Sequence, residues 1–121
     1  MNYDKLFDIE EIIVEDRKTG KEKTVTIYKP KYEKGKIFAP LRDKYLDAKP
    51  EEKVRQEFIC RLINDYGYTL EQMAQEVQLT SSSRGTGRAS ADIVVWRTKE
   101  EKEQNKTAFL VVELKAEAIK T

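Results

Sequence analysis

Three residues near the end of the chain have the types and spacing to hold a hard cation beside an amine. Asp92 opens the β-branched run 92–96, while Glu113 and Lys115 close the apolar run 108–115. Side chains alternate between the two faces of a strand, so Glu113 and Lys115 share a face if the second run is a strand. We therefore expect a carboxylate and an amine side by side where this strand ends.

Antiparallel pairing of the two strands would add Asp92 to this pair. If Trp96 lies opposite Phe109, Asp92 lies opposite Glu113, with β carbons about 4.5–5.5 Å apart. Two carboxylates that close repel each other unless a proton or a cation lies between them. With Lys115 beside them, we predict a magnesium site, where the ion would polarise a phosphate and lower the pKa of a bound water.

Each of these residues has a structural interpretation as well. Glu113 and Lys115 could be a charge pair on a solvated strand end, and Asp92 could be a turn or strand-start residue. In the cation site, Lys115 could orient the water, help to deprotonate it, or stabilise the charge on the phosphate.

The clearest predicted element that could position this site is a helix over residues 50–66. Pro50, with Glu51 and Glu52 beside it, suits the first turn and the helix dipole, and Gly67 fits a C-terminal stop. Apolar residues recur every three or four positions, which predicts one buried stripe. The stripe consists of Val54, Phe58, Ile59, Leu62, Ile63 and Tyr66.

Four polar residues of this helix can be assigned to a side. At about 100° per residue, Glu52, Arg55 and Gln56 face the sheet, whereas Glu57 faces solvent. An unpaired arginine is rarely buried, so Arg55 is predicted to pair with Glu52 or another buried carboxylate. Glu52 could reach the cation site, or it could only compensate the helix dipole.

The other segments predict smaller elements. These are a hairpin over 8–29 that turns at Gly20, a connector over 29–49 with one short apolar contact, a short helix over 70–74 and a strand near 76–79. The strand 108–115 is expected to be buried on both faces in its middle. The charged stretch after Trp96 is predicted to be a solvated link, and Trp96 and Tyr66 are predicted to pack in the core.

Composition narrows the chemistry further. The 121 residues include no histidine and one cysteine, Cys60, which excludes histidine-dependent catalysis, a disulfide framework and a structural zinc site. The net charge of +1 means that any nucleic-acid surface must be a local patch. No apolar stretch approaches the roughly 20 residues of a membrane span, and the lone cysteine fits a reducing, cytoplasmic compartment.

Two groups of basic residues could contact phosphates. Residues 17–36 hold eight Lys or Arg against Glu22 and Glu33, which a solvated hairpin tip explains equally well. Arg84 and Arg88 lie in a Ser/Gly-rich loop beside the predicted site and are the better phosphate ligands, although loop solubility would also explain them.

Three segments in this order resemble the PD-(D/E)xK nuclease signature, and most fully the N-terminal nuclease domain of type I restriction enzyme R subunits. The segments are PEEKVRQEFICRLINDYGY at 50–68, ADIVVW at 91–96 and FLVVELKA at 109–116. The resemblance implies that Asp92 and Glu113 bind magnesium and that Lys115 is the motif lysine. It also implies a helix carboxylate, which we assign to Glu52 with Glu57 as the second choice.

The resemblance implies an α/β fold with a restriction endonuclease-like sheet flanked by helices. We expect four or five strands in one mixed, mostly antiparallel sheet. Residues 1–49 would form the N-terminal hairpin and connector, and residues 50–121 the nuclease core, within one domain. The core is expected to be truncated at its C-terminal end, as a piece of a longer protein.

The function that the resemblance implies is magnesium-dependent hydrolysis of DNA phosphodiester bonds in a restriction–modification system; another divalent cation could serve. The implied partners are DNA and the methyltransferase and specificity subunits of a restriction complex. No ATP site is present in these residues, so ATP-driven translocation would be housed elsewhere. The alternative is a catalytically inactive module of the same fold that binds DNA or partner subunits.

Overall fold

The computed structural model describes residues 3–78 and 90–114 of the chain. The helices are α1 (Tyr3–Leu6), α2 (Pro50–Tyr66), α3 (Lys99–Glu103) and a 3-10 helix, η1 (Leu70–Gln72). The strands are β1 (Asp8–Glu15), β2 (Glu22–Lys29), β3 (Tyr32–Glu33), β4 (Lys36–Ala39), β5 (Lys44–Asp47), β6 (Met73–Gln78), β7 (Ser90–Val95) and β8 (Leu110–Val112).

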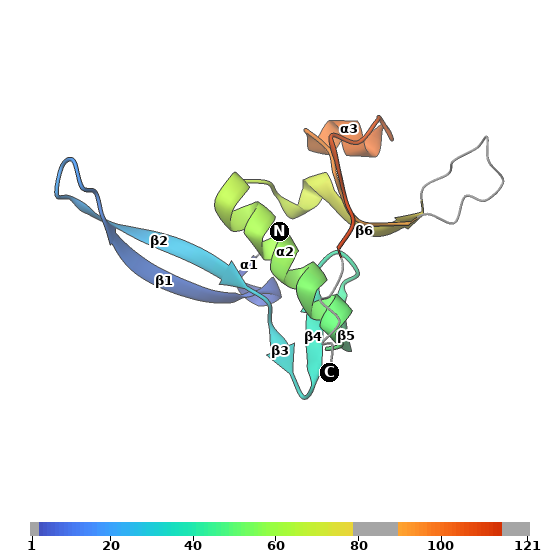
Figure 1. The fold of residues 1–121 in the computed structure, drawn as a ribbon, viewed down its shortest axis with the longest axis horizontal. Helices are drawn as coiled ribbons and strands as arrows, with labels where there is room; N and C mark the ends of the chain where they lie inside the picture. Colours follow the sequence, from blue (N-terminus) through green and yellow to red (C-terminus); the bar gives the residue numbers. More distant parts are fainter. Residues whose placement is uncertain (1–2, 79–89, 115–121) are drawn as a thin grey trace, which may run out of the picture.

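These strands form three small antiparallel sheets, in the orders β1-β2, β3-β4-β5 and β6-β7-β8 (Figure 1). The predicted α/β class is therefore confirmed. The single sheet of four or five strands is not seen in the described residues, because each strand pairs only with its neighbours in the sequence. Helix α2 lies at the centre, between the sheets (Figure 1).

The predicted N-terminal hairpin is confirmed and extends away from the rest of the molecule (Figure 1). Strands β1 and β2 pair in continuous register from Asp8↔Lys29 to Glu15↔Glu22. Gly20 adopts a left-handed conformation with φ of 70° in the turn, as its position predicted.

The connector over 29–49, expected to have one short apolar contact, contains more regular structure than that, because it forms the sheet β3-β4-β5. In β4, alternate residues Ile37 and Ala39 are fully buried, which anchors the short strands to the core. Gly35 and Asp43 turn the chain between the strands with φ of 77° and 53°. This alternation spans only four residues, so in a segment flanked by prolines it does not predict a strand.

The predicted principal helix is confirmed as α2, with Pro50 in its first turn and Gly67 as a left-handed C-cap. Its apolar side contributes Ile59 and Leu62 to the core. Tyr66, the last residue of α2, was expected in the core but is 67% exposed, so the buried side of the helix ends before its last residue.

The sheet β6-β7-β8 has the register predicted for its last two strands. Ile93 pairs with Val112 and Val95 with Leu110, so Asp92 and Glu113 are the next positions in the same register, just beyond the ladder. Among the described residues β8 is an edge strand, and its Leu110 and Val111 are 36% and 48% exposed. The expected burial of this strand on both faces is therefore wrong.

The segments around this sheet also differ in part from expectation. The predicted helix over 70–74 is the shorter η1, and the strand predicted near 76–79 begins earlier, at Met73. Trp96 is buried as predicted, and its indole Nε1 donates a hydrogen bond to the Lys106 carbonyl at 2.9 Å. The charged link contains α3, whose N-cap Thr98 accepts a hydrogen bond from the Glu101 amide.

Most of the core lies between α1, α2, β6 and β7. Its fully buried members are Ile59, Met73, Ile93 and Val95, with Phe7, Cys60, Leu62 and Leu70 nearly so. Within the described residues, no helix has both the length and the apolar character needed to cross a membrane.

Leu62→Ala should lower the free energy of unfolding by about 2–5 kcal/mol, because it leaves a cavity in this core. Tyr66→Ala, on the same helix but exposed, should change it by no more than about 0.5 kcal/mol. Urea denaturation of both variants measures the difference. Equal losses would contradict the packing of α2.

Cys60 should resist alkylation in the folded chain. Its burial and the nearby charge of Glu57 raise the pKa of the thiol to about 12, and the thiolate is the reactive form. Because the folded pKa is raised, the stability contributed by the neutral thiol is present at neutral pH and is lost as the pH rises from about 9 towards 12. Iodoacetamide at pH 8 should label this single cysteine only in urea, which mass spectrometry would detect; rapid labelling without urea would contradict its burial.

Candidate functional site

The side chain of Arg55 in α2 is shared by three carboxylates from three elements. Its Nη1 lies 2.5 Å from Glu52 Oε1 and 3.8 Å from Glu76 Oε1, and its Nη2 lies 3.0 Å from Asp92 Oδ1. The side chains of Arg55 and Glu52 are each only 11% exposed. The prediction that Arg55 pairs with Glu52 or another carboxylate is confirmed for both.

Asp92 joins this cluster to the strand that follows it. While Oδ1 accepts from Arg55, Oδ2 accepts a hydrogen bond from the Leu114 amide at 2.7 Å. Both carboxylate oxygens are thus engaged, one by a side chain of α2 and one by the backbone just after β8. Asp92 therefore fixes the position of the Glu113 segment relative to α2.

Two buried glutamines extend the polar network. Gln56 Nε2 donates to Glu52 Oε2 at 2.7 Å and to Gln75 Oε1 at 3.1 Å. Gln56 is 1% exposed and Gln75 7%. Arg55 Nε and Gln56 Oε1 are buried with no hydrogen-bond partner in the described part of the chain. A buried, unpaired polar atom is costly, so these two atoms mark a network that is not fully satisfied here.

Glu76 is a site residue that sequence reasoning missed. It lies between the ladder pairs Gln75↔Ile93 and Val77↔Ala91, so it is level with Asp92 across the sheet. Its φ of 54° is left-handed, which is uncommon for glutamate and typical of strained functional positions. The available signal was Gln75, a polar residue where the strand should present an apolar one.

Glu76 also forms an ion pair with Arg42, from the turn between β4 and β5. This contact links the N-terminal segment to the cluster and was not predicted either. Nothing in the sequence around Arg42 distinguishes it from other surface basic residues.

The charge of Arg55 is strongly favoured at this position. Burial opposes the charge, but the hydrogen bond to Asp92 and the charges of Glu52 and Glu76 together raise its pKa above the ordinary value. The guanidinium is therefore a permanent cation at the centre of three acidic groups.

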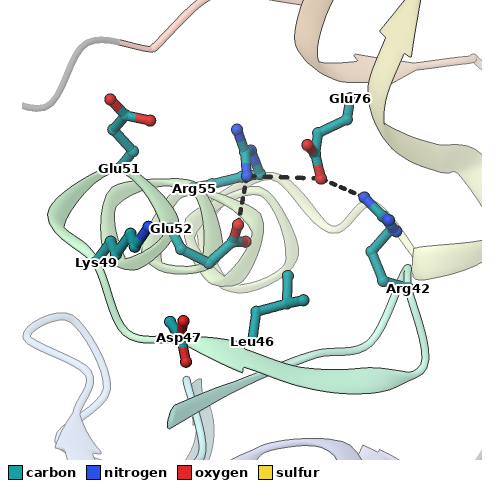
Figure 2. A pocket seen from close by; sticks show the side chains of 8 residues that line it. All are labelled: Arg42, Leu46, Asp47, Lys49, Glu51, Glu52, Arg55 and Glu76. Carbon is teal, nitrogen blue, oxygen red and sulfur yellow. Dashed lines mark hydrogen bonds and ion pairs between the residues drawn. The ribbon is translucent and has the colours of Figure 1, made fainter. Parts of the chain in front are cut away.

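A cavity of about 320 Å³ opens beside this cluster. Glu52 and Arg55 reach it from α2, and Glu76 and Arg42 approach it from the other side (Figure 2). Its remaining lining residues are Leu46, Asp47, Lys49 and Glu51. Asp92 does not line the cavity, whereas Arg55 both lines it and contacts Asp92.

The other predicted site residues are either exposed or outside the described part of the chain. Glu57 is exposed, as the wheel predicted, and Glu113 is exposed beyond the end of β8. Lys115, Arg84 and Arg88 lie outside the described residues.

Residues 17–36 are spread along the hairpin and the strands β3 and β4. Within this range, Lys29 pairs with Glu10 and Lys36 with Asp47. Part of the basic stretch is therefore already neutralised by local acidic residues.

The chemistry of the donor set suits magnesium. Glu52, Asp92 and Glu113 offer carboxylate oxygens, and Gln56 offers a buried amide oxygen without a partner, which suits a hard cation. Across residues 3–78 and 90–114, however, no three acidic, cysteine or histidine side chains are close enough to bind one ion. The donors fit the ion in chemistry, while Arg55 neutralises Glu52 and Asp92. The magnesium-binding roles stay a prediction.

Comparison with protein families gives one match. The family described as the type I restriction enzyme R protein N terminus (HSDR_N) matches residues 50–121, well over half of the chain. The matched range includes α2 and all of the sheet β6-β7-β8. Comparison with curated proteins and with solved structures gave no match.

Glu52→Gln should lower the free energy of unfolding by about 1–3 kcal/mol, because Arg55 would lose a buried charged partner. Glu57→Gln, one and a half turns away on the exposed side, should change it by no more than about 0.5 kcal/mol. Urea denaturation at neutral pH measures both. A larger effect of Glu57→Gln would contradict the assignment of Glu52 to the buried cluster.

Proposed function

Because the chain belongs to the type I restriction enzyme R protein N-terminus family, we propose that it is a nuclease domain that hydrolyses DNA phosphodiester bonds with magnesium. The family supports a role in a restriction system. Placement in the PD-(D/E)xK superfamily is part of the proposal, because it rests on the order of motifs along the chain.

The observation that carries the proposal is the register of β7 and β8. It brings Asp92 level with Glu113 from a separate strand, and Arg55 links Asp92 to Glu52 of α2. Three segments far apart in the sequence thereby bring carboxylates to one end of one sheet. Carboxylates arranged around a strand end are suited to bind a hard cation and a phosphate together.

The proposed roles follow from this arrangement. Asp92 and Glu113 hold the magnesium ion, and Glu52 assists directly or through a water. When bound, the ion supplies charge to the phosphate and lowers the pKa of a water. Lys115, two residues after Glu113, would share its face if the strand continues, and there it would orient the attacking water, help to deprotonate it, or stabilise the charge on the phosphate.

The substrate and partners are proposed on the same basis. Arg84 and Arg88, in the segment between β6 and β7, would contact DNA phosphates. In a restriction complex the chain would work with methyltransferase and specificity subunits, and ATP-driven translocation would be housed elsewhere.

A second candidate is a catalytically inactive module that binds DNA or partner subunits. The observation that favours it is the pairing of Arg55 with Asp92 and Glu52, which neutralises both carboxylates without a metal ion. In that case the cluster would serve only to hold α2 on the sheet.

Plasmid cleavage with magnesium separates the two candidates. The wild-type chain should relax supercoiled DNA, and Asp92→Ala, Glu113→Ala and Lys115→Ala should each slow cleavage by at least about a hundredfold. Asp65→Ala, which removes an exposed carboxylate from the far end of α2, should cleave at the wild-type rate.

Cleavage that survives Asp92→Ala would place the active centre elsewhere and refute the proposal. DNA retention that weakens with salt, in the absence of cleavage, would favour the inactive module.

A further inference from the structure

We infer that Arg55 is a built-in counterion that neutralises Asp92 while no divalent cation is bound, and turns towards Glu76 when one binds. The inference rests on the proposed function, because it takes Asp92 to be a magnesium ligand. It makes Arg55 a positioning residue, which sets how readily Asp92 becomes available.

The charge of Arg55 lies against two of the proposed magnesium ligands. Its guanidinium donates to Asp92 at 3.0 Å and to Glu52 at 2.5 Å, the two carboxylates of β7 and α2 that the proposal assigns to magnesium. A cation bound by Asp92 would therefore compete with Arg55 for that carboxylate. Binding of one must weaken binding of the other by the same factor.

Arg55 contacts Asp92 through a different guanidinium nitrogen from the one that contacts Glu52. Nη2 contacts Asp92, whereas Nη1 contacts Glu52 and lies 3.8 Å from Glu76. Arg55 can thus release Asp92 and close the longer gap to Glu76 without losing Glu52. The guanidinium would stay paired throughout, which avoids the large cost of an unpaired buried charge.

There is also open space beside Arg55, next to Glu76. The cavity of about 320 Å³ is lined by Glu52, Arg55 and Glu76, and Asp92 lies outside its lining (Figure 2). Arg55 and Glu76 line the same cavity, so Arg55 has open space beside it on the side where Glu76 also lies. Glu76, the carboxylate that would receive Arg55, is also the residue with the left-handed backbone.

Magnesium binding to the 121-residue chain, measured by calorimetry without DNA, tests the competition. Arg55→Gln removes the competing charge, so the Kd for magnesium should fall about tenfold. Arg61→Gln removes an exposed charge from the same helix and should leave the Kd within about twofold of wild type, because solvent and salt screen it. Equal changes in the two variants, or no magnesium binding by either wild type or Arg55→Gln, would overturn the inference.

A measurement on the wild-type chain covers the case in which Arg55→Gln fails to fold. The side-chain ¹⁵Nε signal of Arg55, assigned with Arg55→Lys, should shift as magnesium saturates the chain, while that of Arg61 should not. A purely structural ion pair would leave the Arg55 signal unmoved at saturation, and that result would overturn the inference.

The two proposals can fail separately. Asp92-dependent DNA cleavage, with a magnesium Kd that Arg55→Gln does not change, would overturn the counterion role and leave the nuclease proposal standing. Tighter magnesium binding by Arg55→Gln, in a chain that cuts no DNA, would support the counterion role and refute the nuclease proposal.

Discussion

The shared ion pair of Arg55 is the constraint on which the rest of the site depends. Helix α2 can bury its apolar side against the sheet only if the charged residues of its first turns are neutralised there. The part-buried ion pair of Arg55 and Asp92 joins the helix to β7 across 37 residues of sequence, and removing either partner would leave the other charge poorly compensated. The same contact engages the carboxylate that the proposed chemistry would need, so under that proposal stability and activity are in opposition.

The parts of the site that could be predicted follow from strict geometric periods. Strand alternation and one assumed pair, Trp96 with Phe109, were enough to place Asp92 opposite Glu113, because a ladder without an inserted residue keeps its register. Arg55 could be predicted as paired because a charge on the buried side of a helix needs a partner. These inferences needed no knowledge of the surrounding structure.

The parts that could not be predicted depend on contacts between elements. The wheel gives the direction of Tyr66 but not how far the packing surface extends along the helix, and the side chain is exposed. The left-handed backbone of Glu76 could not be predicted, since the sequence offers no glycine or asparagine there to indicate it. Ile37 and Ala39 alternate over too few residues for a strand to be distinguished from a proline-flanked connector.

The N-terminal segment contributes to the candidate site although the family match begins at residue 50. Arg42 reaches Glu76 from the turn between β4 and β5, and Asp43 in that turn adopts a left-handed φ of 53°. Arg42 and Arg55 share one oxygen, Glu76 Oε1, so each limits how strongly the other can bind it. The sheet β3-β4-β5 therefore influences the charge balance around Asp92 through three successive ion pairs, Arg42 with Glu76, Glu76 with Arg55, and Arg55 with Asp92. A chain that kept only the matched residues would retain the three carboxylates and Arg55, but it would lose the group that competes with Arg55 for Glu76.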